Sequence, residues 1–188
     1  MQSDAKNNLA VIADGKVLAA KVLIVDDDYY TRKVIRTLLA MVGVVNVHDA
    51  VDGTSGLEAI CALRPDIVVL DWEMPGIDGA EFMRRVRSPA DFAYANVPII
   101  MLTGYSERSR VVEALGLGVH EYLLKPVSSK ALFDSFVSVL SSPRPMVRRG
   151  GYYGPEPRLV STYKPDAGSY NLRAEQEAVR SPALRIVV

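Results

Sequence analysis

The sequence predicts an α/β fold, with a doubly wound parallel sheet of five strands flanked by five helices. Two observations lead to this prediction. Short runs of β-branched and other apolar residues recur along the chain, and between them lie longer segments whose apolar residues return every three or four positions. This alternation is typical of parallel sheets, because the crossover between two parallel strands usually contains a helix.

The predicted strands are apolar on both faces, as buried parallel strands are. They span residues 21–26, 45–48, 66–70, 97–102 and 121–124. The predicted helices span residues 30–42, 53–63, a segment around Phe82, Met83 and Val86, and then residues 107–115 and 128–140. Each of these segments places its apolar residues on one side at helical spacing.

Charge and proline content divide the chain near residue 142. Of 188 residues, 22 are Lys or Arg and 22 are Asp or Glu, but residues 1–140 carry a net charge of −4 and residues 141–188 one of +4. Six of the 11 prolines also lie in the second part. We therefore expect an N-terminal extension at 1–20, one domain at 21–141 and a basic Pro/Gly/Tyr-rich tail at 142–188.

Composition argues against several classes of protein. Zero net charge argues against a strongly basic nucleic-acid binder, and no apolar run approaches the ~20 residues that span a bilayer. The start of the chain has no signal-peptide pattern, and a single cysteine, Cys61, allows no internal disulfide. We expect a cytoplasmic protein with Cys61 in its core. His48 and His120 have no metal-ligand spacing and are expected to be bystanders.

Polar residues follow four of the predicted strands. Asp26 to Asp28 follow the first, Asp71 the third, Thr103 the fourth and Lys125 the fifth. These ends lie at one edge of a parallel sheet, where ligands bind in such folds. Clustered carboxylates favour Mg²⁺, and a carboxylate beside Mg²⁺, a hydroxyl and an ammonium group suits phosphoryl transfer. Taken singly, Asp26 to Asp28 would be read as a solvated turn, and Asp71 as a helix cap or a loop acid. Capping is the role we expect for Asp28.

Four blocks of sequence resemble one known family. They are VLIVDDD (22–28), DIVVLDWEMPGIDG (66–79), PIIMLTG (98–104) and YLLKP (122–126). In this order and at this spacing they look like the receiver domain of two-component response regulators, over about residues 21–140. The resemblance implies the chemotaxis-type strand order 2-1-3-4-5.

The resemblance also implies a phosphorylation site. Asp71 would be the phosphoacceptor. Asp27 would ligate Mg²⁺ directly, Asp26 mostly through water, and Glu73 through its backbone carbonyl. Each of these residues stands where the family's motif has the corresponding group.

Further residues match the family's phosphoryl-binding and switching positions. Thr103 and Lys125 would grip the phosphoryl group, and the peptide bond before Pro126 is often cis in this family. Tyr122 matches the aromatic switch position, although a half-buried strand aromatic is an equal reading. Glu73 and Tyr105 stand where the family tunes the dephosphorylation rate.

The function implied is that of a stand-alone phosphorelay switch rather than an enzyme. A histidine kinase or phosphotransfer protein would be the donor, and a protein yet to be identified would read the switched surface. Whether the chain forms a homodimer stays open. The alternative is a phosphorylation-independent binding or dimerisation module. An aspartate-nucleophile phosphatase needs a second Asp where this chain has Glu73, and a DNA-binding regulator needs an output domain longer than the tail.

Both ends of the chain leave alternatives open. The tail is either a disordered basic linker or an arm that docks on an acidic receiver domain, its own or a partner's. At the N-terminus, Asp14 and Gly15 lie between apolar runs, which is compatible with a hairpin or with an unstructured segment.

Overall fold

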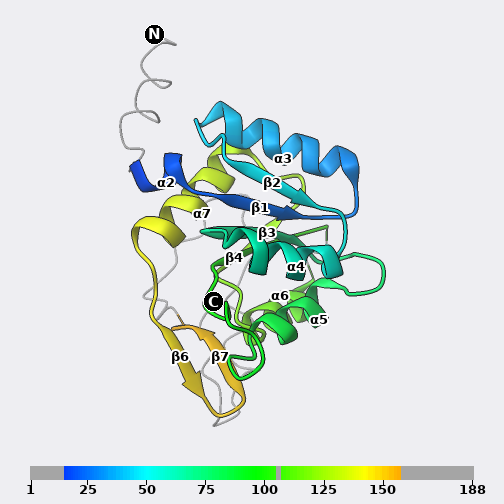
Figure 1. Cartoon of the computed structure of the whole chain (residues 1–188), viewed down its shortest axis with the longest axis vertical. Coiled ribbons are helices and arrows are strands. Elements are labelled where there is room, and N and C mark those ends of the chain that lie inside the picture. Colours follow the sequence, from blue (N-terminus) through cyan, green and yellow to red (C-terminus); the bar gives the residue numbers. More distant parts are fainter. Residues whose placement is uncertain (1–14, 105–106, 158–188) are drawn as a thin grey trace.

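Five parallel strands form the central sheet in the order β2-β1-β3-β4-β5 (Figure 1). The computed structural model describes residues 15–104 and 107–157. Its elements are α2 (Gly15–Ala19), β1 (Val22–Val25), α3 (Tyr29–Met41), β2 (Val47–Ala50), α4 (Gly53–Leu63), β3 (Ile67–Asp71), α5 (Gly79–Val86), β4 (Ile99–Thr103), α6 (Arg108–Gly116), β5 (Glu121–Leu124), α7 (Ser129–Ser141), β6 (Met146–Arg149) and β7 (Tyr152–Pro155). The predicted α/β class and strand order are confirmed.

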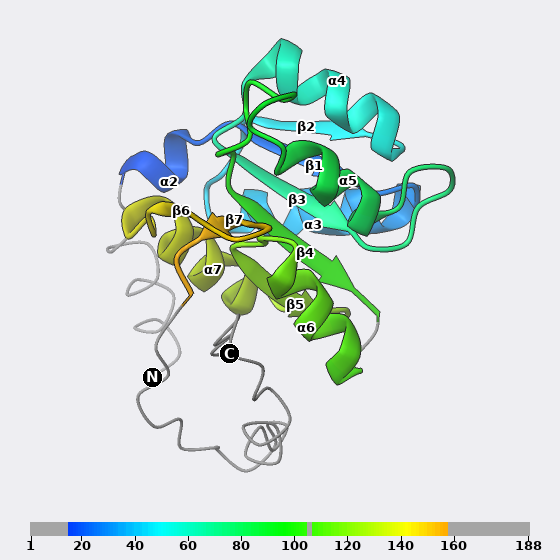
Figure 2. The same cartoon turned by 90° about the horizontal axis from the view of Figure 1, so that it is seen from below.

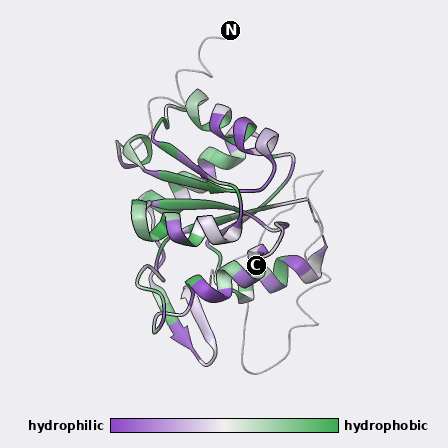
Figure 3. Cartoon of the chain, turned by 45° about the vertical axis from the view of Figure 1, so that its right-hand side comes forward, coloured by the Kyte–Doolittle hydropathy of each residue, from purple (hydrophilic) through white to green (hydrophobic). Residues whose placement is uncertain are grey.

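Two apolar cores lie on opposite faces of the sheet because successive strand residues point to opposite sides. Val22 and Ile24 of β1 belong to one core, and Leu23 and Val25 to the other. Helices α2, α3 and α7 cover the first core, and α4, α5 and α6 cover the second (Figure 2). In Figure 3 the central strands are mostly hydrophobic, while the helices that flank them mix hydrophobic and hydrophilic residues.

The second strand begins two residues later than predicted. Val45 is 76% exposed, and its carbonyl accepts a hydrogen bond from the backbone of Val47 at 3.0 Å, so this part of the chain turns. Pairing with β1 begins at Val47, opposite Val22. The apolar Val45 therefore belongs to a turn and not to the strand.

Two other expectations were wrong. Gly15–Ala19 is helical rather than part of a hairpin, and Val17 is fully buried in the core that α7 also lines. Asp14 and the residues before it lie outside the described part of the chain. Cys61 is exposed, because it follows the buried Ile60 on α4 and the core-facing stripe of that helix does not include it.

The first part of the tail is a folded hairpin. Strands β6 and β7 pair antiparallel, with Arg149 opposite Tyr152, and the pair follows α7 directly (Figure 1). The hydroxyl of Tyr153 donates a hydrogen bond to Asn96, which precedes β4, at 2.5 Å. The hairpin therefore packs at the amino-terminal edge of the sheet, opposite the edge at which the predicted site residues lie.

A buried cation lies beneath this hairpin. Arg87, at the end of α5, is 7% exposed and donates hydrogen bonds to the carbonyls of Ala95 (2.5 Å) and Gly118 (2.9 Å). Its guanidinium also approaches Nδ1 of His120, which accepts a hydrogen bond from the backbone of Ile99 at 3.2 Å. Burial lowers the pKa of Arg87 to about 10. Burial, with the charge of Arg87 beside it, lowers the pKa of His120 to about 3, so the imidazole is neutral.

Arg144 ties the hairpin to the start of β5. Its guanidinium donates to the main-chain carbonyl of His120 and, at 3.1 Å, to that of Glu156. For residues 142–157 the structure thus favours the docked arm over the linker. The hairpin segment does not dock through pairs of opposite charges. Arg144 donates to main-chain carbonyls, and the buried residue next to the hairpin, Arg87, is itself a cation. Residues 158–188 lie outside the described part.

Two glycines let the hairpin approach the domain closely. A Cβ atom on Gly154 would lie 2.6 Å from the Cα of Gly118 and 2.5 Å from the hydroxyl oxygen of Tyr152. Gly118 has φ +86°, and a Cβ there would meet the carbonyl oxygen of Tyr153 at 2.5 Å. Larger residues at either position would push the two backbones apart.

We expect the substitution Gly154→Ala to lower the free energy of unfolding by about 1–3 kcal/mol, the usual cost of overpacking. Gly151→Ala is the matched control, because a Cβ at Gly151 meets nothing within 4 Å. Its effect should stay within about 0.5 kcal/mol. Urea unfolding of the full chain measures both. Equal stability of the two variants would mean that the hairpin does not dock in solution.

Candidate functional site

The carboxyl ends of four strands bring the predicted site residues to one edge of the sheet. Asp26 and Asp27 follow β1, Asp71 ends β3, Thr103 ends β4 and Lys125 follows β5. Because the strands are parallel and in register, these ends lie side by side. The convergence expected from the sequence is therefore present.

Three carboxylates form the centre of this site. One oxygen from each of Asp26, Asp27 and Asp71 lies within 4.8 Å of the others. Asp26 is 1% exposed and Asp71 7%, whereas Asp27 faces solvent. Ionised carboxylates this close repel one another, so the site favours a compensating cation.

Lys125 supplies one such cation. Its ammonium nitrogen lies 2.9 Å from Oδ2 of Asp26 and 2.9 Å from Oδ1 of Asp71. The backbone of Lys125 donates to the carbonyl of Thr103 at 2.7 Å, and the peptide bond to Pro126 is cis. The side chain thus bridges two strands that do not adjoin β5.

Asp71 and Lys125 titrate away from their usual values. Burial raises the pKa of Asp71, and the charge of Asp26 adds to the rise, while Lys125 opposes it. Burial alone would lower the pKa of Lys125, but its hydrogen bonds to Asp71 and Asp26 outweigh burial and raise it. At neutral pH Lys125 remains charged.

Backbone groups orient the two buried carboxylates. The N–H of Trp72 donates to Oδ1 of Asp71 at 2.8 Å, and the N–H of Asp28 donates to Oδ1 of Asp26 at 2.8 Å. Asp28 caps α3 by accepting from the backbone of Tyr30 at 2.6 Å, as expected. The first turn of α3 is thereby anchored next to the acidic cluster.

Thr103 and Tyr122 form a second pair at this edge. Thr103 is buried, and Tyr122 on β5 is half-buried. Burial raises the pKa of the Tyr122 hydroxyl, while a hydrogen bond with the side chain of Thr103 and the charge of Arg110 lower it. The predicted switch residues are therefore in contact. Tyr105 lies outside the described residues.

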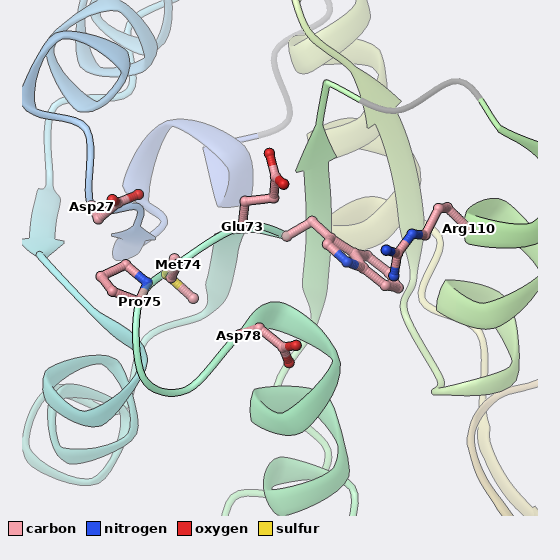
Figure 4. Close-up of a pocket in the computed structure, with 7 residues that line it drawn as sticks. Asp27, Glu73, Met74, Pro75, Asp78 and Arg110 are labelled. Atoms are coloured by element: carbon pink, nitrogen blue, oxygen red, sulfur yellow. The ribbon is translucent and has the colours of Figure 1, made fainter.

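A cavity of about 390 Å³ adjoins the acidic cluster. It is lined by Asp27 and by the loop that follows Asp71, including Glu73, and it reaches Arg110 on α6 (Figure 4). The guanidinium of Arg110 lies over the ring of Trp72, 5.3 Å from its centroid. The cavity is therefore acidic at the end near Asp27 and basic at the end near Arg110.

Sequence reasoning missed Trp72 and Arg110. The two are far apart in the chain, and a cation over an aromatic ring leaves no periodic or motif signal in a single sequence. It also assigned no role to His120, which accepts a hydrogen bond from the backbone of Ile99 and lies beside Arg87.

Comparison with known proteins decides the family. The model of the response regulator receiver domain matches residues 22–136. The chain belongs to this family. The matched region ends within α7, and the β6–β7 hairpin lies beyond it.

Chemotaxis proteins are among its relatives. Chemotaxis protein CheY of Pseudomonas aeruginosa is 38% identical over 119 residues, which are 63% of this chain and 94% of the relative. Chemotaxis protein CheY-3 of Vibrio cholerae is 35% identical over 112 residues, covering 60% of this chain and 85% of the relative.

Solved receiver structures have the same fold. Vibrio cholerae CheY4 aligns with a TM-score of 0.58 at 32% identity, covering 64% of this chain and 98% of that one. The receiver domain of the Francisella response regulator 1452 aligns with a TM-score of 0.59 at 30% identity, covering 65% and 97%.

Membership carries general properties of receiver domains. They act in phosphorylation-dependent signalling, between histidine kinases and downstream effectors, and bind Mg²⁺ at an acidic pocket. The three clustered carboxylates of this receiver domain offer the hard oxygen ligands that Mg²⁺ prefers, so the donor set fits the metal. Within residues 15–104 and 107–157, no helix is long and apolar enough to cross a membrane.

We expect Asp71→Asn to be more stable than the wild type at neutral pH in a metal-free buffer, by an amount on the order of 1 kcal/mol. When folding raises the pKa of an acid, that acid stabilises the folded state, and this contribution is complete at pH values below the ordinary pKa of 3.8. The contribution is lost as the pH rises through the raised pKa. The ionised carboxylate therefore costs stability at neutral pH, and the amide removes this cost.

Urea unfolding at a series of pH values measures the difference, which should shrink as the pH falls towards 3.8. Asp52→Asn is the control of opposite sign, because the hydrogen bonds of Ser55 lower the pKa of Asp52. It should be less stable than the wild type at neutral pH, with the difference again fading in acid. A pH-independent gain in Asp71→Asn would contradict the raised pKa.

Proposed function

We propose that this protein is a stand-alone response regulator of a phosphorelay, in which Asp71 accepts a phosphoryl group in the presence of Mg²⁺. The observation that carries the proposal is the bridge from Lys125 to Asp26 and Asp71, 2.9 Å to each carboxylate, within a cluster of three carboxylates. The bridge holds Asp71 in place and leaves a fixed ammonium group beside it, ready to contact a phosphoryl oxygen.

The metal would be held by this chain's own oxygen atoms. Asp26, Asp27 and Asp71 would contribute carboxylate oxygens, with Asp26 acting mostly through water, and Glu73 would contribute its backbone carbonyl. Bound there, Mg²⁺ supplies positive charge that neutralises phosphoryl oxygens. Lys125 alone cannot balance three carboxylates and an incoming phosphoryl group, which is why a divalent cation suits the site.

The transfer itself needs one bond to form and one to break. A carboxylate oxygen of Asp71 attacks the phosphorus atom and forms a P–O bond, while the bond from phosphorus to the imidazole nitrogen of a phosphohistidine breaks. The imidazole leaves with the electron pair. Because the product is a modified side chain that hydrolysis resets, we propose a switch and not a turnover enzyme.

The contact between Thr103 and Tyr122 would convert the added charge into a change of shape. The phosphoryl oxygens are strong acceptors, and the Thr103 hydroxyl would turn towards them and give up its hydrogen bond to Tyr122. Tyr122 would then turn inward and change the surface formed by α6, β5 and α7. A histidine kinase or phosphotransfer protein would donate the phosphoryl group, and a downstream protein would read this surface.

Mg²⁺ should raise the melting temperature of the wild type, because a ligand that binds only the folded state stabilises it. Asp27→Asn should abolish most of this rise. The matched control is Asp28→Asn, which alters the adjacent carboxylate that caps α3 and lies outside the metal cluster. That variant should keep the Mg²⁺-dependent rise. Thermal unfolding with and without Mg²⁺ measures both, and an equal loss in the two variants would contradict the assigned ligands.

Incubation with acetyl phosphate and Mg²⁺ should add one phosphoryl group to the wild type and none to Asp71→Asn, because Asp71 is the nucleophile. Intact mass measures the addition, and Asp28→Asn serves as a variant that should still be labelled. If neither the wild type nor any variant is labelled under conditions that label a known receiver domain, the proposal is contradicted. That result would instead support a phosphorylation-independent binding or dimerisation module.

A further inference from the structure

An apolar stripe runs along the outer side of α3, opposite the side that faces the core. Tyr30, Val34 and Met41 of this helix are 76%, 54% and 71% exposed, and Val45 in the turn after the helix is exposed as well. We call these four residues the outer stripe. Large apolar side chains gathered on one surface usually mark a place that another group covers.

The outer stripe has the spacing of a helix face that packs against a second segment. Positions 30, 34, 37 and 41 fall on one narrow side of a helix with 3.6 residues per turn. None of these four positions holds a charged residue. Thr37 is the polar member of the series, and its hydroxyl donates a hydrogen bond to the carbonyl of Lys33 at 2.8 Å. The polar group of this face is therefore satisfied within the helix, and the face can be covered by apolar side chains without leaving a donor unpaired.

The described part of the chain begins beside one end of the outer stripe. Helix α2 lies at the side of the molecule where α3 ends (Figure 1). Leu18 of α2 lies against the turn after α3, since a Cβ atom on Gly43 would be 3.0 Å from its Cδ2. Leu18 is also partly exposed, so it extends the apolar surface towards α2. Residues 1–14 therefore join the described structure at the Met41 and Val45 end of the outer stripe.

The sequence just before α2 supplies apolar side chains of its own. Leu9, Val11 and Ile12 follow a largely polar start of the chain. Each residue of an extended chain spans up to about 3.5 Å, so from Gly15 the side chain of Ile12 can reach about 10 Å and that of Leu9 about 20 Å. Helix α3 has 13 residues, which corresponds to a length of about 20 Å. The apolar run is therefore within reach of the nearer half of the stripe.

We propose that the apolar run at residues 9–12 covers the outer stripe from Val34 to Val45. Burial of apolar surface drives this contact. The run is tethered beside the stripe, and its high local concentration gives it an advantage over free molecules. The N-terminal extension is thus an intramolecular cover that keeps an apolar helix face out of contact with other molecules. The inference does not depend on phosphoryl transfer, because none of these residues belongs to the acidic cluster.

The reactivity of Met41 towards hydrogen peroxide tests the cover in the full chain. Peroxide transfers an oxygen atom to an accessible thioether sulfur and leaves as water. Met41 should oxidise about three- to tenfold more slowly in the wild type than in Leu9→Asp/Ile12→Asp, whose charged side chains cannot enter an apolar contact. Mass analysis of peptides at a series of times measures the rate.

Two controls accompany the oxidation experiment. Asn7→Asp/Asn8→Asp adds the same charge outside the apolar run, and in this variant Met41 should react as slowly as in the wild type. Met83 is fully buried and should stay unoxidised in every variant, which shows that the domain remains folded.

A reciprocal experiment alters the stripe instead of the extension. Trypsin can cleave after Lys6 only when the residues around that bond are free to enter the protease. Val34→Asp should speed this cleavage about threefold or more, because the charge releases the apolar run from the stripe. Val51→Asp is the matched control, since Val51 is 53% exposed and lies outside α3. Its cleavage rate, measured by intact mass, should equal that of the wild type.

Each of several outcomes would overturn the inference. Oxidation of Met41 at equal rates in the wild type and in Leu9→Asp/Ile12→Asp would mean that the run does not cover the stripe. Protection of Met41 that grows with protein concentration would identify a second copy of the chain as the occupant. Cleavage after Lys6 that is equally fast in the wild type and in Val34→Asp would show that the stripe does not hold the extension.

Discussion

The bridge from Lys125 to Asp26 and Asp71 is the interaction on which the rest of the site depends. Three carboxylates lie within 4.8 Å of one another at one sheet edge, two of them nearly buried, and this arrangement is unfavourable without positive charge. Lys125 reaches across from the far edge strand to supply part of it. The remaining deficit of positive charge favours a cation at this site, and the raised pKa of Asp71 reflects the cost of burying its carboxylate.

Buried charge is balanced differently at the two ends of the parallel strands, which form the carboxyl edge and the amino edge of the sheet. At the carboxyl edge, charge is concentrated and left incompletely balanced, as a binding site requires. At the amino edge, Arg87 is satisfied by the carbonyls of Ala95 and Gly118 and is covered by the β6–β7 hairpin. The carboxylates at the carboxyl edge can therefore exchange one cationic partner for another. At the amino edge, the backbones at Gly118 and Gly154 lie so close that neither position has space for a side chain.

Strand β5 connects these two edges. It begins next to His120, whose carbonyl accepts a hydrogen bond from Arg144 of the hairpin segment. It carries Tyr122 in its middle and ends just before Lys125. Contacts at both ends of β5 thus tie this strand to the hairpin segment and to the acidic cluster. The hairpin segment, which lies beyond the region matched to the receiver family, therefore supports the same strand that carries Tyr122.

The sequence by itself determined the class of fold, the strand order through its family resemblance, and the acidic cluster with Thr103 and Lys125. These depend on local apolar patterns and on the rule that parallel strand ends share one edge, both of which can be read from one chain. Tertiary structure alone decided the rest. Val45 and Cys61 are apolar residues that long-range packing leaves exposed, and Arg87, His120 and Arg110 gain their roles from partners distant in the chain. The β6–β7 hairpin is also a feature that only the tertiary structure decided. Its docking depends on the close approach of Gly118 and Gly154, which no local sequence pattern encodes.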